Sequence, residues 1–303
     1  MSAAGLDIGA QVAPANKPLV NRFAPFDAAL EAAFASQTAL ALAEDVGAGD
    51  LTGLLVPADA RVKARVLVRE TAVLCGAPWF AAVMQALDAT IRIDWRFAEG
   101  DVMPAGSIVC VIEAPARALL TAERSALNFL QLLSGVATAT RRYVDVVAGT
   151  RAAILDTRKT LPGLRLAQKY AVRVGGGQNQ RLALYDGILI KENHIAAAGG
   201  IEPVMAAAQA LGAGVPIQIE VENLTQLAAA LDAGATAILL DNFDLQTMRN
   251  AVQQTAGRAL LEASGGINHD TVKAIAETGV DRISIGSLTK DVKATDYSLR
   301  IVG

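Results

Sequence analysis

The chain has 303 residues, enough for one large domain or two smaller ones with a substantial buried core. Hydrophobic residues make up 52% of it and aromatic residues only 4%, which is typical of helices packed on sheets through small side chains and argues against disorder. Because the net charge is only −3, a general nucleic-acid-binding surface is not expected.

The sequence also argues against secretion, membrane insertion and a metal centre built on cysteine. The N-terminus lacks a basic start followed by an apolar segment, and no apolar run is long enough to cross a bilayer. The two cysteines, Cys75 and Cys110, lie in separate apolar runs without the spacing of a metal site or a redox pair. We therefore expect a cytoplasmic protein without membrane contacts.

The first part of the chain is expected to form a domain of its own behind a loose end. Residues 1–23 are rich in Ala, Gly, Pro and Asn without periodicity and predict a flexible arm. Residues 24–135 predict an α/β sandwich domain, because helical spacing and alternating apolar residues indicate a helix at 26–43, a strand at 61–74, a helix at 79–87, a strand at 90–97 and a hairpin at 98–115. The hairpin turn contains no lysine, so a lipoyl- or biotinyl-carrier role is not expected.

A long helix with an apolar stripe formed mainly by leucine is predicted over residues 119–147. Glu123 and Arg124 lie within this helix and are flanked by apolar residues. From their position alone, the ordinary interpretation is an exposed or intrahelical charge pair without a functional role.

From about residue 150 the sequence alternates between strands and helices. Amphipathic segments predict helices at 201–212, 224–232, 244–256 and 268–277, and the apolar runs that predict strands are AAILD, DGILIK, PIQIEVE, TAILLD, RALLEASG and DRISIG. This pattern predicts a parallel sheet covered by helices, and its closure into a barrel is favoured over an open sheet, although six strands are fewer than the usual eight. We assign residues 136–289 to this catalytic domain, with residues 290–303 able to pack back on the first domain.

Each of the six apolar runs ends in polar residues or glycine. Because the carboxyl ends of parallel strands meet at one edge of a sheet and line the ligand crevice, these residues predict a catalytic site. In chain order they are Asp156, Thr157, Arg158 and Lys159; Lys191, Glu192, Asn193 and His194; Glu220, Glu222 and Asn223; Asp241 and Asn242; Ser264, Gly265 and Gly266; and Gly286 and Ser287.

Two features of this edge indicate an anionic ligand. The glycine-containing loops after the last two strands are where barrels commonly bind a phosphate through backbone N–H groups. The cations are more numerous than one phosphate requires, and they include Arg158, Lys159, Arg181 and Lys191. A sugar that bears a diphosphate, together with a carboxylated acceptor, would satisfy all of them.

Glu220 and Asp241 place carboxylates at the ends of two successive strands. Hard oxygen ligands of this kind suit Mg²⁺ held jointly with substrate phosphates, or hydrogen bonds to ribose hydroxyls. Alternatively, the two carboxylates neutralise the lysines and arginines of the same edge, and both roles are compatible in one enzyme.

Long motifs in the chain resemble those of the quinolinate phosphoribosyltransferases. The resemblance rests on DTRKTLPGLRLAQKYAVRVGGGQNQR…LIKENHI and continues in IEVENL, ILLDNF, LEASGGI, ISIGSLTKDV, AEDVGAGDLT and ERSALNFLQLLSGVAT. It covers nearly the whole chain after about residue 25. The resemblance implies an N-terminal α/β sandwich domain packed on an incomplete, atypical α/β barrel. It also implies a homodimer, sometimes a higher oligomer, with active sites at the interface.

The reaction that the resemblance implies joins quinolinate to phosphoribosyl pyrophosphate with Mg²⁺ as cofactor, giving nicotinate mononucleotide, pyrophosphate and CO₂ for NAD synthesis. Arg124 is implied to reach into the neighbouring subunit's site and bind a quinolinate carboxylate, which replaces the ordinary interpretation above. The residues implied to bind quinolinate and pyrophosphate in their own subunit are Thr157, Arg158, Lys159, Gln180, Arg181 and Lys191. Those implied for the ribose hydroxyls and the metal are Glu220 and Asp241, and those for the 5′-phosphate are Ser264, Gly265, Gly266, Ile285, Gly286 and Ser287.

One position departs from the family's pattern. The glycine-rich turn of the family usually ends Asn-His-Arg, but here it reads Asn179, Gln180, Arg181. Glutamine can donate a hydrogen bond but cannot become charged near neutral pH, so we expect Gln180 to be a binding group and not a proton carrier. Of the two histidines, His194 adjoins the site in the ENHI motif, and His269 is interpreted as a surface residue at a helix start.

Three other functions are compatible with parts of the same pattern. A Schiff-base aldolase would use Lys191 as its nucleophile, and borohydride trapping with a carbonyl substrate would detect it. A sugar-phosphate-binding module without catalysis is supported only by the phosphate loops and would release no pyrophosphate with any pyridine carboxylate. A divergent paralogue with another acceptor is a closer alternative, because Gln180 lies on the acceptor side.

Overall fold

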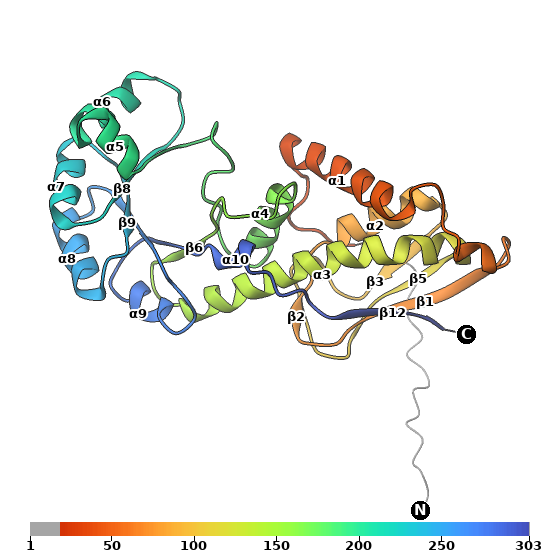
Figure 1. Ribbon diagram of the computed structural model, residues 1–303. Helices are drawn as coiled ribbons and strands as arrows, with labels where there is room; N and C mark the ends of the chain where they lie inside the picture. Colours follow the sequence, from red (N-terminus) through yellow and green to blue (C-terminus); the bar gives the residue numbers. More distant parts are fainter. Residues whose placement is uncertain (1–18, 303) are drawn as a thin grey trace, which may run out of the picture.

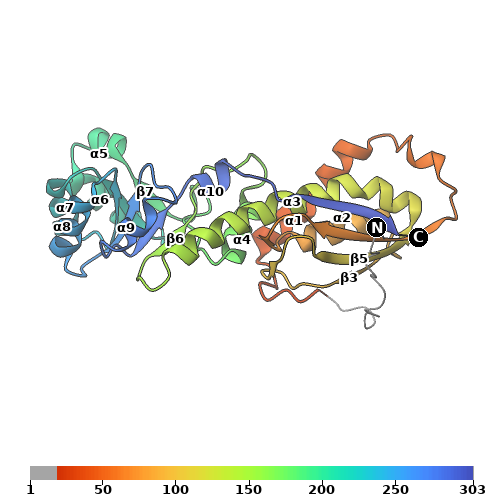
Figure 2. The same ribbon diagram turned by 90° about the horizontal axis from the view of Figure 1, so that it is seen from below.

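The structure is a computed structural model that describes residues 19–302, so most of the predicted arm 1–23 lies outside the described residues. It has two units, each with its own sheet, and the long helix α3 (Ala116–Val146) runs from one to the other (Figure 1). Seen from below, the two sheets lie toward opposite ends of an elongated molecule (Figure 2). Of the residues assigned to the arm, Leu19 and Phe23 pack against the core of the N-terminal unit.

The N-terminal unit is built on a four-stranded antiparallel sheet with the strand order β12-β1-β5-β3. The bounds of these strands are β1 (Arg61–Val68), β3 (Arg92–Trp95), β5 (Ile108–Pro115) and β12 (Tyr297–Val302). A small second sheet pairs β2 (Ala72–Val73) with β4 (Val102–Met103). The helical elements before α3 are α1 (Ala28–Val46), the 3-10 turn η1 (Gly53–Leu55) and α2 (Ala77–Leu87).

The C-terminal strand β12 belongs to the N-terminal sheet. It pairs antiparallel with β1 over six residue pairs, from Lys63–Val302 to Val68–Tyr297. Figures 1 and 2 both show this strand, at the blue end of the chain, beside the orange β1. The chain therefore leaves the first unit through α3, builds the second sheet and returns to complete the first.

The C-terminal unit is a six-stranded parallel sheet with the order β6-β11-β10-β9-β8-β7. The strands are β6 (Ala153–Leu155), β7 (Ile188–Ile190), β8 (Ile217–Val221), β9 (Ala237–Asp241), β10 (Leu260–Ser264) and β11 (Arg282–Ser284). The helices are α4 (Arg165–Val174), α5 (Glu192–Ala198), α6 (Ile201–Ala210), α7 (Leu224–Asp232), α8 (Leu245–Thr255), α9 (Val272–Ala276) and α10 (Ser287–Lys290). Apolar residues on one face of the sheet form its core with the outer helices.

The α/β class and the six parallel strands predicted from the sequence are confirmed, but the favoured closure into a barrel is wrong. β6 and β7 are the two edges of the sheet, and no described strand joins them. Between them the chain forms α4 and the turn 175–177 instead of further strands. At the free edge of β6, the Gln178 N–H donates to the Ile154 carbonyl (2.8 Å), so this turn takes the place of a neighbouring strand. The sheet is thus the incomplete barrel that the family resemblance implied.

The division into domains at residues 135 and 136 stays a prediction. Helix α3 continues through that point without interruption and contributes to the cores of both units. Of the described helices, none combines the length and the hydropathy that crossing a bilayer would require.

Helix α4 of the second unit is anchored in the first unit through Tyr170. The Tyr170 ring packs against Phe26 and Trp79, with centroid distances of 5.2 and 5.3 Å. Its hydroxyl donates to the buried carboxylate of Glu99 (3.1 Å), which also accepts from the Gly76 N–H (2.8 Å) before α2. Burial, partly opposed by these hydrogen bonds, raises the pKa of Glu99 to about 7.

Glu99 is therefore expected to make stability depend on pH. A carboxyl whose pKa is raised on folding, here from 4.5 to about 7, binds its proton more tightly when folded. Its stabilising contribution is full below pH 4.5 and is lost as the pH rises through 7. We predict that the unfolding free energy of the wild type falls by about 3 kcal/mol relative to Glu99→Gln between pH 4.5 and pH 8.

Urea unfolding of both proteins at several pH values measures this difference. Glu31→Gln, at an exposed position in the first turn of α1, is the matched control and should give a curve parallel to that of the wild type. Parallel curves for the wild type and Glu99→Gln would contradict the prediction.

Candidate active site

The residues at the carboxyl ends of the six parallel strands lie along one edge of the sheet. Following the order β7-β8-β9-β10-β11-β6, they are Lys191, Glu220, Asp241, Ser264, Gly286 and Thr157. The fold therefore brings together the residues that the sequence predicted for the second unit, although they are spread over more than a hundred positions of the chain.

The carboxylates of this edge already contact polar partners. Lys191 Nζ donates to Glu220 Oε2 at 2.8 Å, and the Glu220 side chain is mostly buried. Asp241 Oδ2 accepts from Asn242 Nδ2, also at 2.8 Å. The ion pair between Lys191 and Glu220 agrees with the neutralising role considered from the sequence, and it leaves both groups at the strand ends where a ligand can reach them.

The loop after β10 brings backbone close to the strand ends. Gly265 has φ of +102°, and a Cβ at this position would lie 2.1 Å from Asn242 Oδ1, so only glycine fits. Its neighbour Gly266 also has a positive φ, of +59°, with open space around it. Ser264 ends the strand and is the register partner of Asp241. This loop therefore places exposed backbone beside a carboxylate.

The loop after β11 lies under the side chain of Lys159. A Cβ on Gly286 would approach Lys159 Cδ to 3.2 Å and lie 3.9 Å from its Nζ. The Lys159 segment is held in place by two hydrogen bonds, from its own N–H to Thr157 Oγ1 (3.0 Å) and from Thr289 Oγ1 to its carbonyl (2.8 Å). A lysine ammonium thus lies beside the proposed phosphate loop of residues 285–287.

Asp156, directly after β6, organises the loop that follows α4. Its buried carboxylate forms an ion pair with Lys169 of α4 and accepts from Asn179 Nδ2 and from the Gln180 N–H (3.0 Å). Lys169 Nζ also donates to the Gln180 carbonyl (3.0 Å). Burial raises the pKa of Asp156 and lowers that of Lys169, and their mutual attraction opposes both shifts. The backbone at Gln180 is consequently held by two buried charges.

Arg158 and Arg181 lie close enough for their charges to interact. Burial, and after it the neighbouring Arg158 cation, lowers the pKa of Arg181. Among residues 19–302, the Arg181 guanidinium makes one hydrogen bond, from NH1 to the Gly187 carbonyl (2.9 Å), and Arg158 Nε is buried without a hydrogen-bond partner. Two nearby guanidinium groups and an unpaired buried donor form a site that an anion would stabilise.

Gln180 is tied into polar side chains that sequence reasoning missed. Its Oε1 accepts from the Arg181 N–H (2.6 Å), and its Nε2 donates to Gln218 Oε1 of β8. Gln218 in turn donates to Glu262 of β10 (2.9 Å). A cavity of about 350 Å³ opens beside this chain of hydrogen bonds, and it is lined by Gln180, Arg181 and Gln218 together with Arg282. The sequence contained a signal for these two residues, because Gln218 and Glu262 are polar residues within apolar strand segments, each two positions before a predicted site residue.

The two histidines have structural partners. His194 lies in the first turn of α5, where its Nδ1 accepts from the Lys191 N–H at 3.0 Å. It therefore caps the helix and orients the segment that carries Lys191. His269 is exposed, and its ring lies against Tyr143 with a centroid distance of 4.4 Å.

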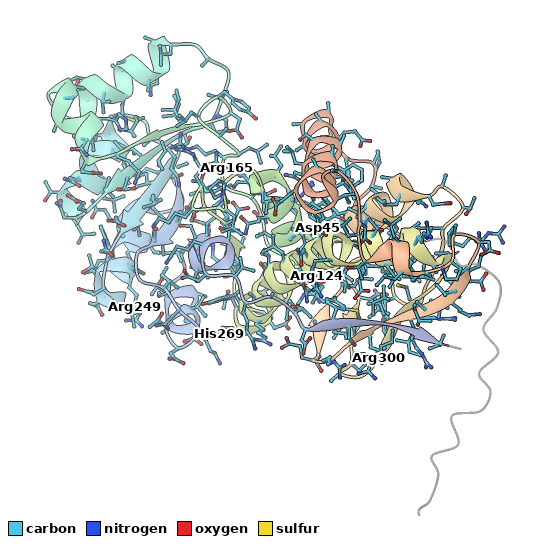
Figure 3. All side chains as sticks on the ribbon, turned by 45° about the vertical axis from the view of Figure 1, so that its right-hand side comes forward. Asp45, Arg124, Arg165, Arg249, His269 and Arg300 are labelled. Carbon is cyan, nitrogen blue, oxygen red and sulfur yellow. The ribbon has the colours of Figure 1, made fainter. Side chains whose placement is uncertain are left out.

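Arg124 lies apart both from the strand ends and from the loop after α4 that carries Gln180 and Arg181 (Figure 3). It is an exposed residue of α3 within the N-terminal unit, as Figure 3 shows. Its guanidinium forms no hydrogen bond or ion pair with any described residue. An arginine on this surface cannot act in the same chain's sheet edge without a large movement, but it is free to meet a second chain.

The donor set restricts what metal this edge could hold. Within residues 19–302, no group of three or more His, Cys, Asp or Glu side chains is placed to bind a metal ion by itself. Mg²⁺, however, is usually bound through one or two carboxylates together with substrate phosphates and water. Glu220 and Asp241 fit Mg²⁺ in that way, as part of a site shared with a diphosphate.

Comparison with known proteins agrees with the motifs and the geometry. The family described as quinolinate phosphoribosyl transferase, C-terminal domain, matches residues 136–300, and the corresponding N-terminal domain matches residues 50–134. Together the two matches span the sheets of both units.

Individual relatives and a solved structure match over most of their length. The probable nicotinate-nucleotide pyrophosphorylase (carboxylating) of Bacillus subtilis is 41% identical over 85% of this chain and 90% of its own. The nicotinate-nucleotide pyrophosphorylase (carboxylating) of Mycobacterium leprae is 42% identical over 86% and 94%. The structure of nicotinate-nucleotide pyrophosphorylase from Francisella tularensis superposes with a TM-score of 0.87 at 42% identity, covering 89% of this chain and 96% of that one. The chain therefore belongs to the quinolinate phosphoribosyl transferase family of enzymes, as its motifs indicated.

Proposed function

We propose that this enzyme transfers the phosphoribosyl group of phosphoribosyl pyrophosphate to quinolinate, with loss of CO₂, and so forms nicotinate mononucleotide for NAD synthesis. The observation that supports this most is that two guanidinium groups, Arg158 and Arg181, lie close together, and that Arg158 Nε is buried without a hydrogen-bond partner among the described residues, which suits a carboxylated ligand. Relatives whose names specify carboxylating pyrophosphorylase or decarboxylating quinolinate phosphoribosyltransferase support the same reaction.

The quinolinate and pyrophosphate end of the site is proposed to lie around the loop after β6 and the loop after α4. Arg158 and Arg181 offer planar donor pairs that match carboxylates, whereas Lys159 and Lys191 offer point charges for phosphate oxygens. Thr157 supplies a hydroxyl beside Lys159. Gln180 is proposed to position this end of the site without carrying a proton, because its amide is neutral.

The phosphoribosyl end is proposed to lie at β8 to β11. Glu220 and Asp241 accept hydrogen bonds from the ribose hydroxyls. The 5′-phosphate is bound by backbone N–H groups and hydroxyls of two loops, namely Ser264, Gly265 and Gly266 with Ile285, Gly286 and Ser287. Gly265 and Gly286 support this assignment, since each is a position of close approach. Bound Mg²⁺ would neutralise negative charge on the diphosphate, with Glu220 and Asp241 as its protein ligands, directly or through water.

Catalysis is proposed to rest on orientation and electrostatics, without a covalent intermediate. As the bond between C1 of the ribose and the pyrophosphate oxygen breaks, the lysines stabilise the negative charge that develops on the leaving group. The arginines hold quinolinate so that its ring nitrogen faces C1. The new bond makes the ring a pyridinium, and when CO₂ leaves, the electron pair of the broken bond stays on the ring carbon beside the positive nitrogen. That carbon then takes a proton from water, which gives the nicotinate ring.

The functional enzyme is proposed to be a homodimer in the cytoplasm. The Arg124 guanidinium supports a shared site, because it forms no hydrogen bond or ion pair with a described residue, interacts electrostatically only with the adjacent Glu123, and lies away from the strand ends of its own chain (Figure 3). In this proposal, Arg124 of each subunit binds a quinolinate carboxylate in the site of the other.

An assay of pyrophosphate release from phosphoribosyl pyrophosphate tests the reaction. We expect release with quinolinate and not with nicotinate, because nicotinate lacks the carboxylate that the second arginine would bind. Removal of divalent metal with EDTA should abolish release, and added Mg²⁺ should restore it. Equal rates with nicotinate would contradict the acceptor assignment, and full activity in EDTA would contradict the metal assignment.

Replacement of either central arginine should impair the reaction. For Arg158→Ala and Arg181→Ala we expect a loss of about 3 kcal/mol in transition-state stabilisation, on the order of 100-fold in kcat/KM for quinolinate. Arg249→Ala is the matched control, since Arg249 is an exposed residue of α8 (Figure 3) and lies outside the two loops that carry Arg158 and Arg181. Near-normal kcat/KM in both site variants would refute this model of the site.

Mixing two inactive variants tests the shared site. In a hybrid of Arg124→Ala and Lys191→Ala chains, one of the two sites has both wild-type residues. Random exchange makes about half of the dimers hybrid, so about a quarter of the wild-type activity should return. A mixture of Lys191→Ala with Arg158→Ala is the control and should stay inactive, since both changes lie in the same subunit's half of the site. Absence of recovery in the first mixture, with subunit exchange verified, would argue against a shared site.

A further inference from the structure

Two buried polar residues lie beneath the site without a place in the proposed reaction. Gln218 and Glu262 are 8% and 1% exposed, and each lies two residues before a strand-end residue of the site, Glu220 or Ser264. Because side chains alternate along a strand, they share the site's face of the sheet. Buried polar side chains in an apolar strand are costly unless their hydrogen bonds are satisfied, so their partners are informative.

The hydrogen bonds from Arg181 through Gln180 and Gln218 to Glu262 form a chain whose direction is set at both ends, and Glu262 has further polar contacts with Ser284 and Gln180. At one end, the Arg181 N–H can only donate, so Gln180 must present Oε1 to it (2.6 Å). Gln180 Nε2 then needs an acceptor and meets Gln218 Oε1. Gln218 Nε2 needs one as well and meets Glu262 Oε2 at 2.9 Å. Each amide therefore has one allowed orientation, which the carboxyl oxygen at the far end completes.

This chain of hydrogen bonds ends at Arg181, a residue that the proposed reaction uses. Gln180 and Arg181 line the same cavity as Gln218, and the Arg181 guanidinium is held at Gly187. Loss of the Gln218 acceptor would leave Glu262 as the remaining side-chain partner of the Gln180 amide, and a turn of the amide toward Glu262 would move its oxygen away from the Arg181 backbone. Gln218 and Glu262 thus influence where Arg181 places its guanidinium.

We propose that Gln218 and Glu262 are positioning residues that orient Gln180 and Arg181 at the quinolinate end of the site. The inference rests on the proposed function for its substrate, but the hydrogen-bond chain itself does not depend on it. It also explains how glutamine functions where the family usually has histidine: a neutral amide fits between a backbone donor and a second amide, so no charge is required at position 180.

Exchanging the amide of Gln218 and the carboxyl group of Glu262 tests this proposal. Gln218→Leu removes both hydrogen bonds, and Gln218→Glu places a second carboxyl against Glu262. Glu262→Gln keeps an acceptor for Gln218. In the double variant Gln218→Glu/Glu262→Gln, the new glutamine can turn its Nε2 toward the new carboxylate, so the chain is complete again with the same composition.

The expected result is a selective loss and its rescue. Gln218→Leu and Gln218→Glu should raise KM for quinolinate about tenfold while KM for phosphoribosyl pyrophosphate changes less than about twofold. In Glu262→Gln, KM for quinolinate should stay within about threefold of the wild type. In the double variant, the KM raised by Gln218→Glu should fall back to the same range. A wild-type KM in Gln218→Leu, or a double variant no better than Gln218→Glu, would overturn the proposal.

A second readout works without turnover. Hydrogen exchange of the peptide over residues 175–187, in the ligand-free protein, should be faster in Gln218→Glu than in the wild type and slow again in the double variant. Equal exchange in all three would overturn the proposal even if KM changed. If Gln218→Leu does not fold, the comparison of Gln218→Glu with the double variant decides. Failure of the wild type to use quinolinate would refute the proposed function alone, because exchange still reports on the chain of hydrogen bonds.

Discussion

The buried carboxylate of Asp156 is the constraint on which the rest of the site depends. A charge removed from water is tolerated only with partners, and this one has Lys169, the Asn179 amide and the Gln180 backbone. Those partners come from α4 and from the loop behind it, so satisfying one carboxylate fixes both elements against the end of β6. The incomplete sheet makes this necessary, because no strand of the described residues lies on that side of β6 to supply the support that a closed barrel would give.

Helix α4 connects this constraint to the other half of the molecule. Two consecutive residues of the helix contact different units. Lys169 contacts Asp156, at the end of a strand of the parallel sheet, and Tyr170 contacts Glu99 of the N-terminal unit. Together with α3 and the return of β12, this contact makes the two units one framework. The position of Arg124 on that framework is consequently defined relative to the site, which matters for an arginine that is proposed to act in a second subunit.

The site keeps like charges together in the absence of ligand. Arg158 and Arg181 interact unfavourably, and Lys159 lies beside the loop that is proposed to bind phosphate. Such an arrangement is stable only because buried hydrogen bonds elsewhere hold the loops, and it is suited to a substrate pair with several negative charges. The family assignment favours a phosphoribosyltransferase over the Schiff-base aldolase and the non-catalytic binding module.

The sequence by itself determined the α/β class, the six strands, the polar strand ends and the family. These follow from local periodicity and from motifs, and the carboxyl ends of parallel strands meet at one edge whatever the order of the strands. Only the tertiary structure decided that the sheet stays open, that β12 returns to β1, and that Gln180 reaches Gln218, 38 residues away, and through it Glu262. The physical reason is that these contacts depend on strand order and register, which bring side chains together from distant parts of the chain and leave no periodic signal in the sequence.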